Sequence, residues 1–525
     1  MKKQTLLTAI LMLLLTACAP IAMQDGNKMH HDGKMHGDDQ MAMPSNIDLV
    51  GDAFYPEGVT TDGRSVFVAS FISGEIQRVD LESGESTTLV EAGVDGVIAG
   101  WGLFYDEAND LVLSCGNTSG FGEPPTTPNV VRAVNPETGD ITQSWALPDG
   151  AICNAVTVDN KGNIYLSNVG LAADIIRIDR ATDTVSIWAA DARWPNDSGF
   201  GLAGAIFDEQ NSVYTHFGGG FFRIPINEDG SAGEAIQQRI VDVEGNETAI
   251  PGVDGLAWAG NNTMLSTNTD FQNGGSEVVR LIAIGSETLV VDSVFNDIHH
   301  AASIAIDGST VYVTDAQFLN SLFQQAPPDL PFQVKAFALK YGSASAGLEA
   351  DWQSVACEVR PSPNQDGGVD PSYLKREITI DHGQLFANFH YFGDPACTFP
   401  IFDVSFSGVA PVVGTMDDVA AGAVQVNLIN GRAAITPFAD FMVNTLNSAQ
   451  VCGANTWESG VSQDILPVGC DVLGIAPNTL VIEYETLLAK DHHLYFGARP
   501  VDGTVLDTPE TRPLTLQIAL TQVKQ

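Results

Sequence analysis

Short apolar segments recur along the first two thirds of the chain at intervals of 44 to 53 residues. A second apolar segment follows each one after a turn rich in Gly, Asn or Asp, as in "NAVTVDNKGNIYLSN" (154–168). Short β-strands repeated at this period are typical of a β-propeller with one blade per repeat. The repeats number six, and their first segments begin at Glu57, Trp101, Asn154, Ala203, Asp254 and Ala302.

The repeat predicts an all-β protein with a six-bladed β-propeller over 46–342. The segment "NIDLV" (46–50) is expected to complete the last blade and close the ring. After a linker of small residues, "GSASAG" (342–347), the period breaks, and alternating strands around Gly-containing turns begin. The last part, 347–525, is therefore expected to form a disulfide-stapled, β-barrel-like domain.

The first 18 residues look like an export signal and not like part of the fold. "MKK" precedes an apolar run that is too short to span a bilayer comfortably. "LTAC" (15–18) resembles a bacterial lipobox, which implies cleavage before Cys18 and lipidation of that residue. The resemblance implies an extracytoplasmic protein that is lipid-anchored to the bacterial cell envelope, and Ala19 favours the outer membrane. The alternative is an ordinary secretory signal with an unmodified cysteine.

Residues 19–45 show no hydrophobic period and are expected to be a flexible tether. They contain five of the ten methionines and three of the ten histidines. Thioether and imidazole groups suit copper ions, so a weak copper site is one hypothesis and a plain solvated tether is the other. The copper ligands would be Met29, His30, His31, Met35 and His36.

The charge of the chain limits its partners. It contains 24 Lys and Arg against 65 Asp and Glu, and the net charge is −41. A nucleic acid would be repelled, so none is expected as a partner. The expected partners are the membrane, through the lipid anchor, and a small-molecule or lipid ligand.

Six cysteines remain after Cys18, and an even number in an exported protein favours disulfides. Cys115 ends a second strand and Cys153 precedes the first strand of the next blade, so both lie on one face and a disulfide is expected, with two buried thiols as the alternative. The last four cysteines allow three pairings. We favour Cys357 with Cys397 and Cys452 with Cys470.

The first strands of a propeller begin beside its axis, so the residues at their tips converge there. Glu57, Asn154 and Asp254 offer a carboxylate, an amide and a carboxylate from alternate blades. Oxygen ligands of this kind suit Ca²⁺ or another divalent ion. The alternative is a polar, water-lined channel without an ion.

Three segments, "YPEGVTTDG" (55–63), "NAVTVDNKGNIYLSN" (154–168) and "VDGLAWAGNNTML" (253–265), resemble the gluconolactonase/regucalcin propeller family and its strictosidine-synthase-like relatives. The resemblance implies that Glu57 and Asn154 are metal ligands and that Asp254 is a ligand and the catalytic acid/base of a lactonase. The other three tips, Trp101, Ala203 and Ala302, carry no ligand, which leaves the metal shell incomplete. Nearby residues that would fill the gap are His216, His299, His300 and Asn117.

Segments of the last third, including "CEVRP" (357–361), "HYFGDPAC" (390–397) and "LYFG" (494–497), resemble the adenomatosis-polyposis-coli down-regulated family. The resemblance implies a β-barrel-like domain that binds a lipid or lipoprotein. The alternative is a domain that merely docks on the propeller. The expected function is therefore a membrane-anchored binding lipoprotein. The alternatives are a metal-dependent lactonase that uses the axial site and a copper-binding lipoprotein that uses the tether.

Overall fold

The computed structural model describes most of the chain from residue 45 onward. The described residues are 45–119, 127–170, 172–194, 201–270, 275–323, 326–363, 369–449, 452–453, 456–470, 473, 475–499, 505–517 and 520–523. The predicted export signal with Cys18 lies outside them, as do the proposed copper ligands Met29, His30, His31, Met35 and His36. No helix in the described part of the chain is both long enough and apolar enough to span a membrane.

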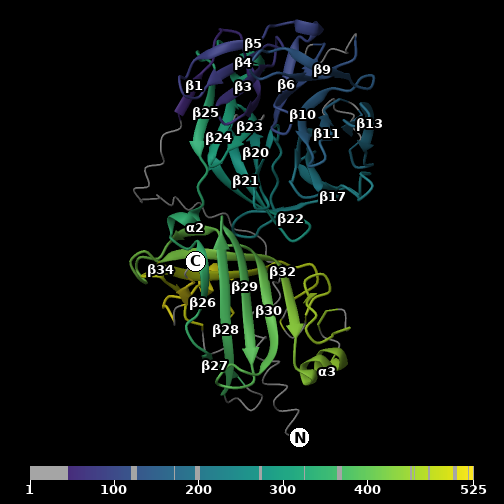
Figure 1. Ribbon diagram of the computed structural model, residues 1–525. Helices are drawn as coiled ribbons and strands as arrows, with labels where there is room; N and C mark the ends of the chain where they lie inside the picture. The colour runs from purple at the N-terminus through teal and green to yellow at the C-terminus, as the bar shows by residue number, and fades with distance from the viewer. Residues whose placement is uncertain are drawn as a thin grey trace.

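The first domain is a propeller of six antiparallel sheets arranged around an axis, as the sequence predicts (Figure 1). The first strands contact one another in a closed ring around that axis. They are β2 (Pro56–Thr61), β6 (Ala99–Asp106), β10 (Cys153–Val158), β14 (Ala203–Phe207), β19 (Leu256–Gly260) and β23 (Ala301–Asp307). The second strands are β3 (Ser65–Ser70), β7 (Leu111–Asn117), β11 (Ile164–Asn168), β15 (Ser212–Phe217), β20 (Thr263–Thr269) and β24 (Thr310–Asp315).

The third and fourth strands of each blade lie farther from the axis than the first two. The third strands are β4 (Ile76–Asp80), β8 (Val130–Val134), β12 (Ile175–Asp179), β16 (Gly220–Pro225), β21 (Ser276–Ile284) and β25 (Gln333–Ala338). The fourth strands are β5 (Ser86–Val90), β9 (Ile141–Ala146), β13 (Thr184–Ala189), β17 (Ile236–Gln237), β22 (Thr288–Phe295) and β1 (Ser45–Asp48). Strand β18 (Arg239–Val241) adds to the fifth blade by parallel pairing with β22.

The ring closes as expected from the segment 46–50. Strand β1 pairs with β25, so the beginning of the described chain supplies the fourth strand of the last blade. The main-chain N–H of Leu49 donates to the carbonyl of Phe332 at 2.8 Å and continues this pairing. Because the first and last parts of the propeller share one sheet, neither can leave the ring without breaking that blade.

The second domain begins after α2 (Gly342–Ser345), a short helix where the sequence suggested only a small-residue linker. Buried Ser343 and the main-chain bonds of Ala344 and Ser345 to the carbonyl of Tyr341 hold this turn in place. The strands that follow are β26 (Ala350–Ser354), β27 (Glu358–Pro363), β28 (Val369–Asp381), β29 (Gln384–Phe392), β30 (Pro400–Val409), β31 (Val412–Thr415), β32 (Val424–Pro437), β33 (Gln463–Asp464), β34 (Val481–Lys490), β35 (His493–Phe496) and β36 (Leu520–Gln522), with α3 (Asp440–Ala449) after β32.

These strands form a sheet that closes on itself. The order runs from β26 through β36, β35, β34, β32, β30 and β29 to β28, and β28 pairs back with β26. We call this closed antiparallel sheet the C-terminal barrel. Its interior is mainly aliphatic and aromatic, with Trp352, Leu487 and Phe496 among the buried side chains.

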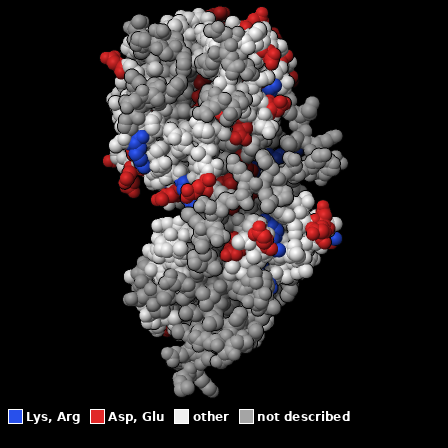
Figure 2. All heavy atoms as spheres, turned by 180° about the vertical axis from the view of Figure 1, so that it is seen from behind, with Lys and Arg blue, Asp and Glu red and all other residues white. Residues whose placement is uncertain are grey.

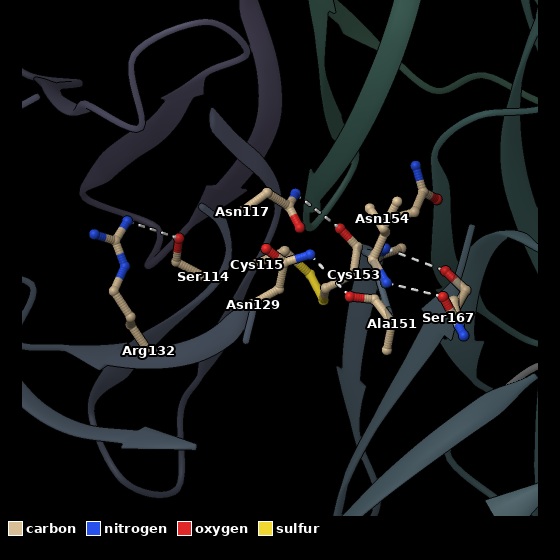
Figure 3. The surroundings of a disulfide bond; sticks show 12 residues. Ser114, Cys115, Asn117, Asn129, Arg132, Ala151, Cys153, Asn154 and Ser167 are labelled. Carbon is tan, nitrogen blue, oxygen red and sulfur yellow. Dashed lines mark hydrogen bonds between the residues drawn. A yellow bond between two sulfur atoms is a disulfide. The ribbon is translucent and has the colours of Figure 1, made fainter. Parts of the chain in front are cut away.

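All six cysteines after Cys18 are paired in the structure. The disulfides join Cys115 to Cys153, Cys357 to Cys397, and Cys452 to Cys470, which are the pairings favoured from the sequence. Figure 3 shows the first of these, which links β7 of the second blade to β10 of the third. It therefore crosslinks two neighbouring blades close to the tip of the third.

The barrel packs against the fifth blade of the propeller, with β21 and β22 nearest to it (Figure 1). Ile282 and Ile284 of β21 share an apolar cluster with Val409 and Ile429 of the barrel. Hydrogen bonds also cross the junction. For example, the Nδ2 of Asn427 donates to the carbonyl of Val243 at 2.8 Å, and the hydroxyl of Tyr484 donates to the carbonyl of Glu244 at 3.2 Å. The two domains thus meet through a packed interface.

Candidate functional site

β-Bulges bend five of the six first strands at their tips, beside the axis. The pairing of first and second strand shifts register at the tip in five blades, for example between Cys153 and Val156. A bulge bends its strand and changes the direction of the side chains next to it. At these bulges, hydroxyl groups of the second strands accept hydrogen bonds from main-chain N–H groups of the first strands. Ser167 accepts from Ala155 at 3.1 Å (Figure 3). Thr314 accepts from Ser303 at 3.0 Å.

Glycines follow the tips of four blades, and the ring requires them. A Cβ atom on Gly58 would lie 2.0 Å from the carbonyl oxygen of Trp101, and one on Gly102 would lie 2.4 Å from that of Asn154. Gly255 makes the same approach to the carbonyl of Ala302, at 2.6 Å. Each first strand thus lies directly against the tip of the next one. The recurring "EG", "WG", "AG" and "DG" pairs in the sequence carry this signal, which the sequence analysis missed.

The three oxygen-bearing tip residues predicted from the sequence lie in one axial cavity of about 600 Å³. The Nδ2 of Asn154 donates to Asp254 Oδ1 at 3.2 Å, and the main-chain N–H of Gly204 donates to Asn154 Oδ1 at 2.9 Å. These bonds hold the amide of Asn154 between the fourth and fifth blades. Glu57 completes the group, and its Oε2 is buried without a hydrogen-bond partner in the described part of the chain.

The two carboxyl groups share a strongly anionic environment. Burial raises the pKa of Asp254 to about 6, against the hydrogen bond from Asn154, which lowers it. Burial and the nearby Asp254 raise the pKa of Glu57 well above its usual value. The described residues that line the axial cavity include no Lys or Arg. No basic side chain in this lining therefore balances a negative charge on either carboxyl group.

This donor set fits a hard divalent cation. Two carboxylates and one amide oxygen are ligands of the kind that Ca²⁺ prefers, and the unpartnered Oε2 of Glu57 has a lone pair available. The oxygen of Asn154 accepts one hydrogen bond, which leaves its second lone pair for an ion. Across the described residues, no cluster of three or more His, Cys, Asp or Glu side chains forms a metal site. Among the described residues, no further carboxylate, imidazole or thiolate therefore joins Glu57 and Asp254 as a ligand.

The side chains considered as additional ligands do not line the axial cavity. His216 bonds through Nε2 to the carbonyl of Ile250 at 3.0 Å, and His299 bonds through Nδ1 to Asp315 at 2.9 Å. Asn117 donates to the carbonyl of Cys153 at 3.4 Å, as Figure 3 shows. His300 packs against the ring of Phe318, with 4.9 Å between centroids. The expectation that these residues complete the metal shell is not met.

An aromatic cluster that the sequence analysis did not identify covers part of the tip end. Phe71 stacks on Trp101 with 5.7 Å between ring centroids and packs on Phe318 at 4.5 Å. All three side chains are buried. Phe318 lies in η2 (Phe318–Phe323), an insertion between the second and third strands of the last blade. The cluster therefore joins the first, second and last blades beside the tips.

The axial cavity opens at the end opposite to the tips. The residues that line its tip end, including Glu57 and Asn154, are buried or half-buried, whereas Glu107, Asn160 and Glu209 at the other end are exposed. Acidic side chains also outnumber basic ones on the described surface of the propeller in Figure 2. An acidic entrance raises the local concentration of cations.

No family model matches the chain. It is similar to the solved structures of the major allergen Mala s 1 from Malassezia sympodialis (15% identity, TM-score 0.45) and of a calcium-binding regucalcin from Agrobacterium tumefaciens (14%, 0.40). A third similar structure is a gluconolactonase from Xanthomonas campestris (12%, 0.39). Each match covers 57% of this chain, and 97%, 96% and 91% of the other chains, respectively. Because all three TM-scores are below 0.5, the functional conclusion rests on the axial site itself.

Proposed function

We propose that the chain is an extracytoplasmic binding protein whose propeller binds a divalent cation at its axis through Glu57, Asn154 and Asp254. The observation that carries this proposal is a pair of buried carboxyl groups in a cavity without a basic side chain among its described lining. The three disulfides support a location outside the reducing cytoplasm. The lipobox-like "LTAC" supports anchoring through Cys18 to the bacterial outer membrane.

The physical argument for a cation is the cost of two buried negative charges. Ionised carboxylates that lie together in a recessed site repel each other and lose hydration. A proton on one carboxyl group relieves this repulsion, and a bound cation relieves it with both groups ionised. Ca²⁺ takes six to eight oxygen ligands, so three protein oxygens leave positions for water or for an oxygen-bearing ligand.

Calorimetric titration of the full chain with Ca²⁺, Mn²⁺ and Zn²⁺, after treatment with a chelator, tests the proposal. We expect one equivalent of at least one ion to bind and the heat to be lost in both Glu57→Gln and Asp254→Asn. The matched control is Glu209→Gln, which removes an exposed carboxylate at the mouth of the same cavity and should retain binding. Absence of binding with all three ions, or equal loss in the control, would refute the assignment.

A metal-dependent hydrolase is the second candidate, and the position of the Asp254 carboxyl group in the axial cavity favours it. A positioned carboxylate is one of the groups that act as a general base. In this role Asp254 would take a proton from water, and the cation would polarise the carbonyl of a lactone. Hydrolysis of a panel of lactones by the wild type, with loss in Asp254→Asn and retention in Glu209→Gln, would support it. If an ion binds but no lactone is hydrolysed, the hydrolase role is refuted and only the binding role remains.

We propose that the C-terminal barrel binds an acyl ligand, as its sequence resemblance implies. Along β29, Leu385, Ala387 and Phe389 belong to the apolar cluster of the interior, while Phe386 between them is exposed. Phe389 is half-buried and lies 6.0 Å from Phe406 of β30, measured between ring centroids, beside the apolar cluster that would contact an acyl chain.

Mass spectrometry of the full chain purified without detergent tests for a bound lipid. We expect acyl species in the wild type and in the control Phe386→Asp, and their loss in Phe389→Asp. Circular dichroism must show that Phe389→Asp still folds. Folded protein without any acyl species in the wild type would contradict a lipid-binding barrel.

A further inference from the structure

A second cavity, of about 290 Å³, lies where the propeller meets the barrel. The fourth and fifth blades line it from one side, with Asp208, Tyr214 and Trp258 among its residues. Gln384 and Phe386 of β29 line it from the other. All of its lining residues belong to the described part of the chain. We call it the junction cavity.

The two charged side chains of the junction cavity are already bound to the protein. Asp208 Oδ1 accepts hydrogen bonds from the main-chain N–H groups of three residues, at 2.8 to 2.9 Å: Gln210, Asn211 and Ser212. The guanidinium of Arg223 donates to the hydroxyl of Ser212 at 3.2 Å and to the carbonyl of Ser286 at 3.3 Å. A ligand of this cavity therefore needs no net charge.

Neutral carboxamides supply much of the remaining polarity, and three of them make only long hydrogen bonds with one another. Gln210 Nε2 donates to Asn262 Oδ1 at 3.4 Å, and Asn262 Nδ2 donates to Gln384 Oε1 at 3.4 Å. Both distances are at the long end for a hydrogen bond. Gln384 is 6% exposed, and its Nε2 has no hydrogen-bond partner in the described structure. A buried, unpartnered donor is costly unless a ligand or water accepts from it.

Aromatic rings complete the junction cavity. Tyr214 and Trp258 are stacked with 6.2 Å between centroids and 25° between planes. Phe386 presents an exposed ring, 48% accessible, from the barrel side. A sugar ring places its C–H face on such an aromatic surface and its hydroxyl groups against carboxamides, which donate and accept at once.

We propose that the junction cavity binds a neutral saccharide, held by the carboxamides of Asn262 and Gln384 and by the rings of Trp258 and Phe386. The volume lies near the lower end of the range of about 300–1,000 Å³ for small-molecule sites, which suits one sugar unit rather than a long glycan. The position between two packed domains is also a usual one for ligand sites. This proposal is independent of the cation at the axis.

Saturation-transfer NMR of the full chain with glucose, galactose, mannose and N-acetylglucosamine tests the proposal. We expect transfer to at least one sugar, and roughly tenfold weaker binding in both Gln384→Glu and Phe386→Ala. The matched control is Phe399→Ala, since Phe399 is similarly exposed on the barrel (53%) and does not line the cavity. Glu57→Gln should leave sugar binding intact.

The variants are compared by melting temperature and circular dichroism, so that a loss of binding is not confused with misfolding. Phe386→Ala removes an exposed ring and is expected to leave both unchanged. Transfer to none of the four sugars would overturn the proposal. Transfer that persists at full strength in Gln384→Glu and Phe386→Ala would also overturn it, because the sugar would then bind elsewhere.

Discussion

Replacement of Asp254 by Asn should stabilise the cation-free propeller at neutral pH. Burial raises the pKa of Asp254 from 3.8 to about 6, so folding favours the protonated form. A pKa difference of about 2 corresponds to at most about 3 kcal/mol of lost stability, fully present above pH 6. The penalty shrinks as the pH falls from 6 towards 4, because the carboxyl becomes protonated in the folded state first. Asn keeps the oxygen that accepts from Asn154 and carries no charge.

Thermal unfolding in the presence of a chelator measures this effect. For a unit of roughly 300 residues, about 3 kcal/mol corresponds to about 5 °C in melting temperature. We expect Asp254→Asn to raise the propeller transition by that amount at pH 7.5 and by less than about 1 °C at pH 4. The exposed control Glu209→Gln should change it little at either pH. An unchanged or lower melting temperature at pH 7.5, or an equal rise at pH 4, would refute the electrostatic reasoning.

Three further predictions test the packing of the fold. Gly58→Ala places a Cβ 2.0 Å from a main-chain oxygen and should destabilise the propeller by about 3 kcal/mol or more, whereas Gly275→Ala, with a contact at 4.0 Å, should not; denaturant unfolding of both variants decides. Removal of the disulfide in Cys115→Ala/Cys153→Ala, which closes 38 residues, should lower the unfolding free energy by about 4 kcal/mol, and an unchanged value would show that the crosslink adds nothing. Arg376→Met removes the 2.8 Å partner of half-buried Glu358, which keeps Arg360 at 3.3 Å, and should cost about 1.5–3 kcal/mol, while Arg376→Met/Glu358→Gln should recover most of it in a double-mutant cycle.

The repeat made the propeller predictable because each blade repeats the same local signals. Apolar runs, turns and spacing indicate the number of blades. Asn154 and Asp254 both stand at the tip of a first strand, and this shared position is enough to predict that they meet at the axis, where they lie within hydrogen-bond distance. The pairing of Cys115 with Cys153 follows from the same geometry, since neighbouring blades present their strand ends on one face. These inferences need only the period and the direction of each strand.

Features that depend on distant segments were not predictable in this way. The direction in which the axial cavity opens depends on which strand ends remain exposed, and the repeat treats all blades alike. Phe318 reaches the tips through the insertion η2, which has no counterpart in the pattern of the other blades. Closure of the barrel by pairing of β26 with both β28 and β36 joins residues far apart in sequence. The alternation of apolar and polar residues along a strand predicts which face of the strand is buried, but it does not predict which other strands pair with it.

The barrel interior also breaks the simple rule that alternating apolar residues face inward. Arg376 occupies an inward position on β28 between Leu374 and Ile378, and it is 2% exposed. Its charge is balanced by Glu358, and its guanidinium lies 5.2 Å from the ring centroid of Phe496. From the sequence alone, an arginine at this position predicts that the side chain lies on the outer, solvent-facing side of the barrel. Only the partner on a neighbouring strand explains why the charge is tolerated inside.

Trp258 connects the two proposed sites, because it is the one described residue that lines both the axial cavity and the junction cavity. It lies on β19, which begins two residues after Asp254, and its ring stacks on Tyr214 at the junction. If the strand moved when a cation bound, sugar affinity would change, and by thermodynamic reciprocity the sugar would change cation affinity by the same factor. The close backbone packing of Gly255 against Ala302 argues against such movement, since a shift of this strand would open the ring. We therefore expect the two ligands to bind independently, with a sugar affinity that is the same with and without saturating Ca²⁺. A change that disappears in Glu57→Gln would show instead that β19 couples the two cavities.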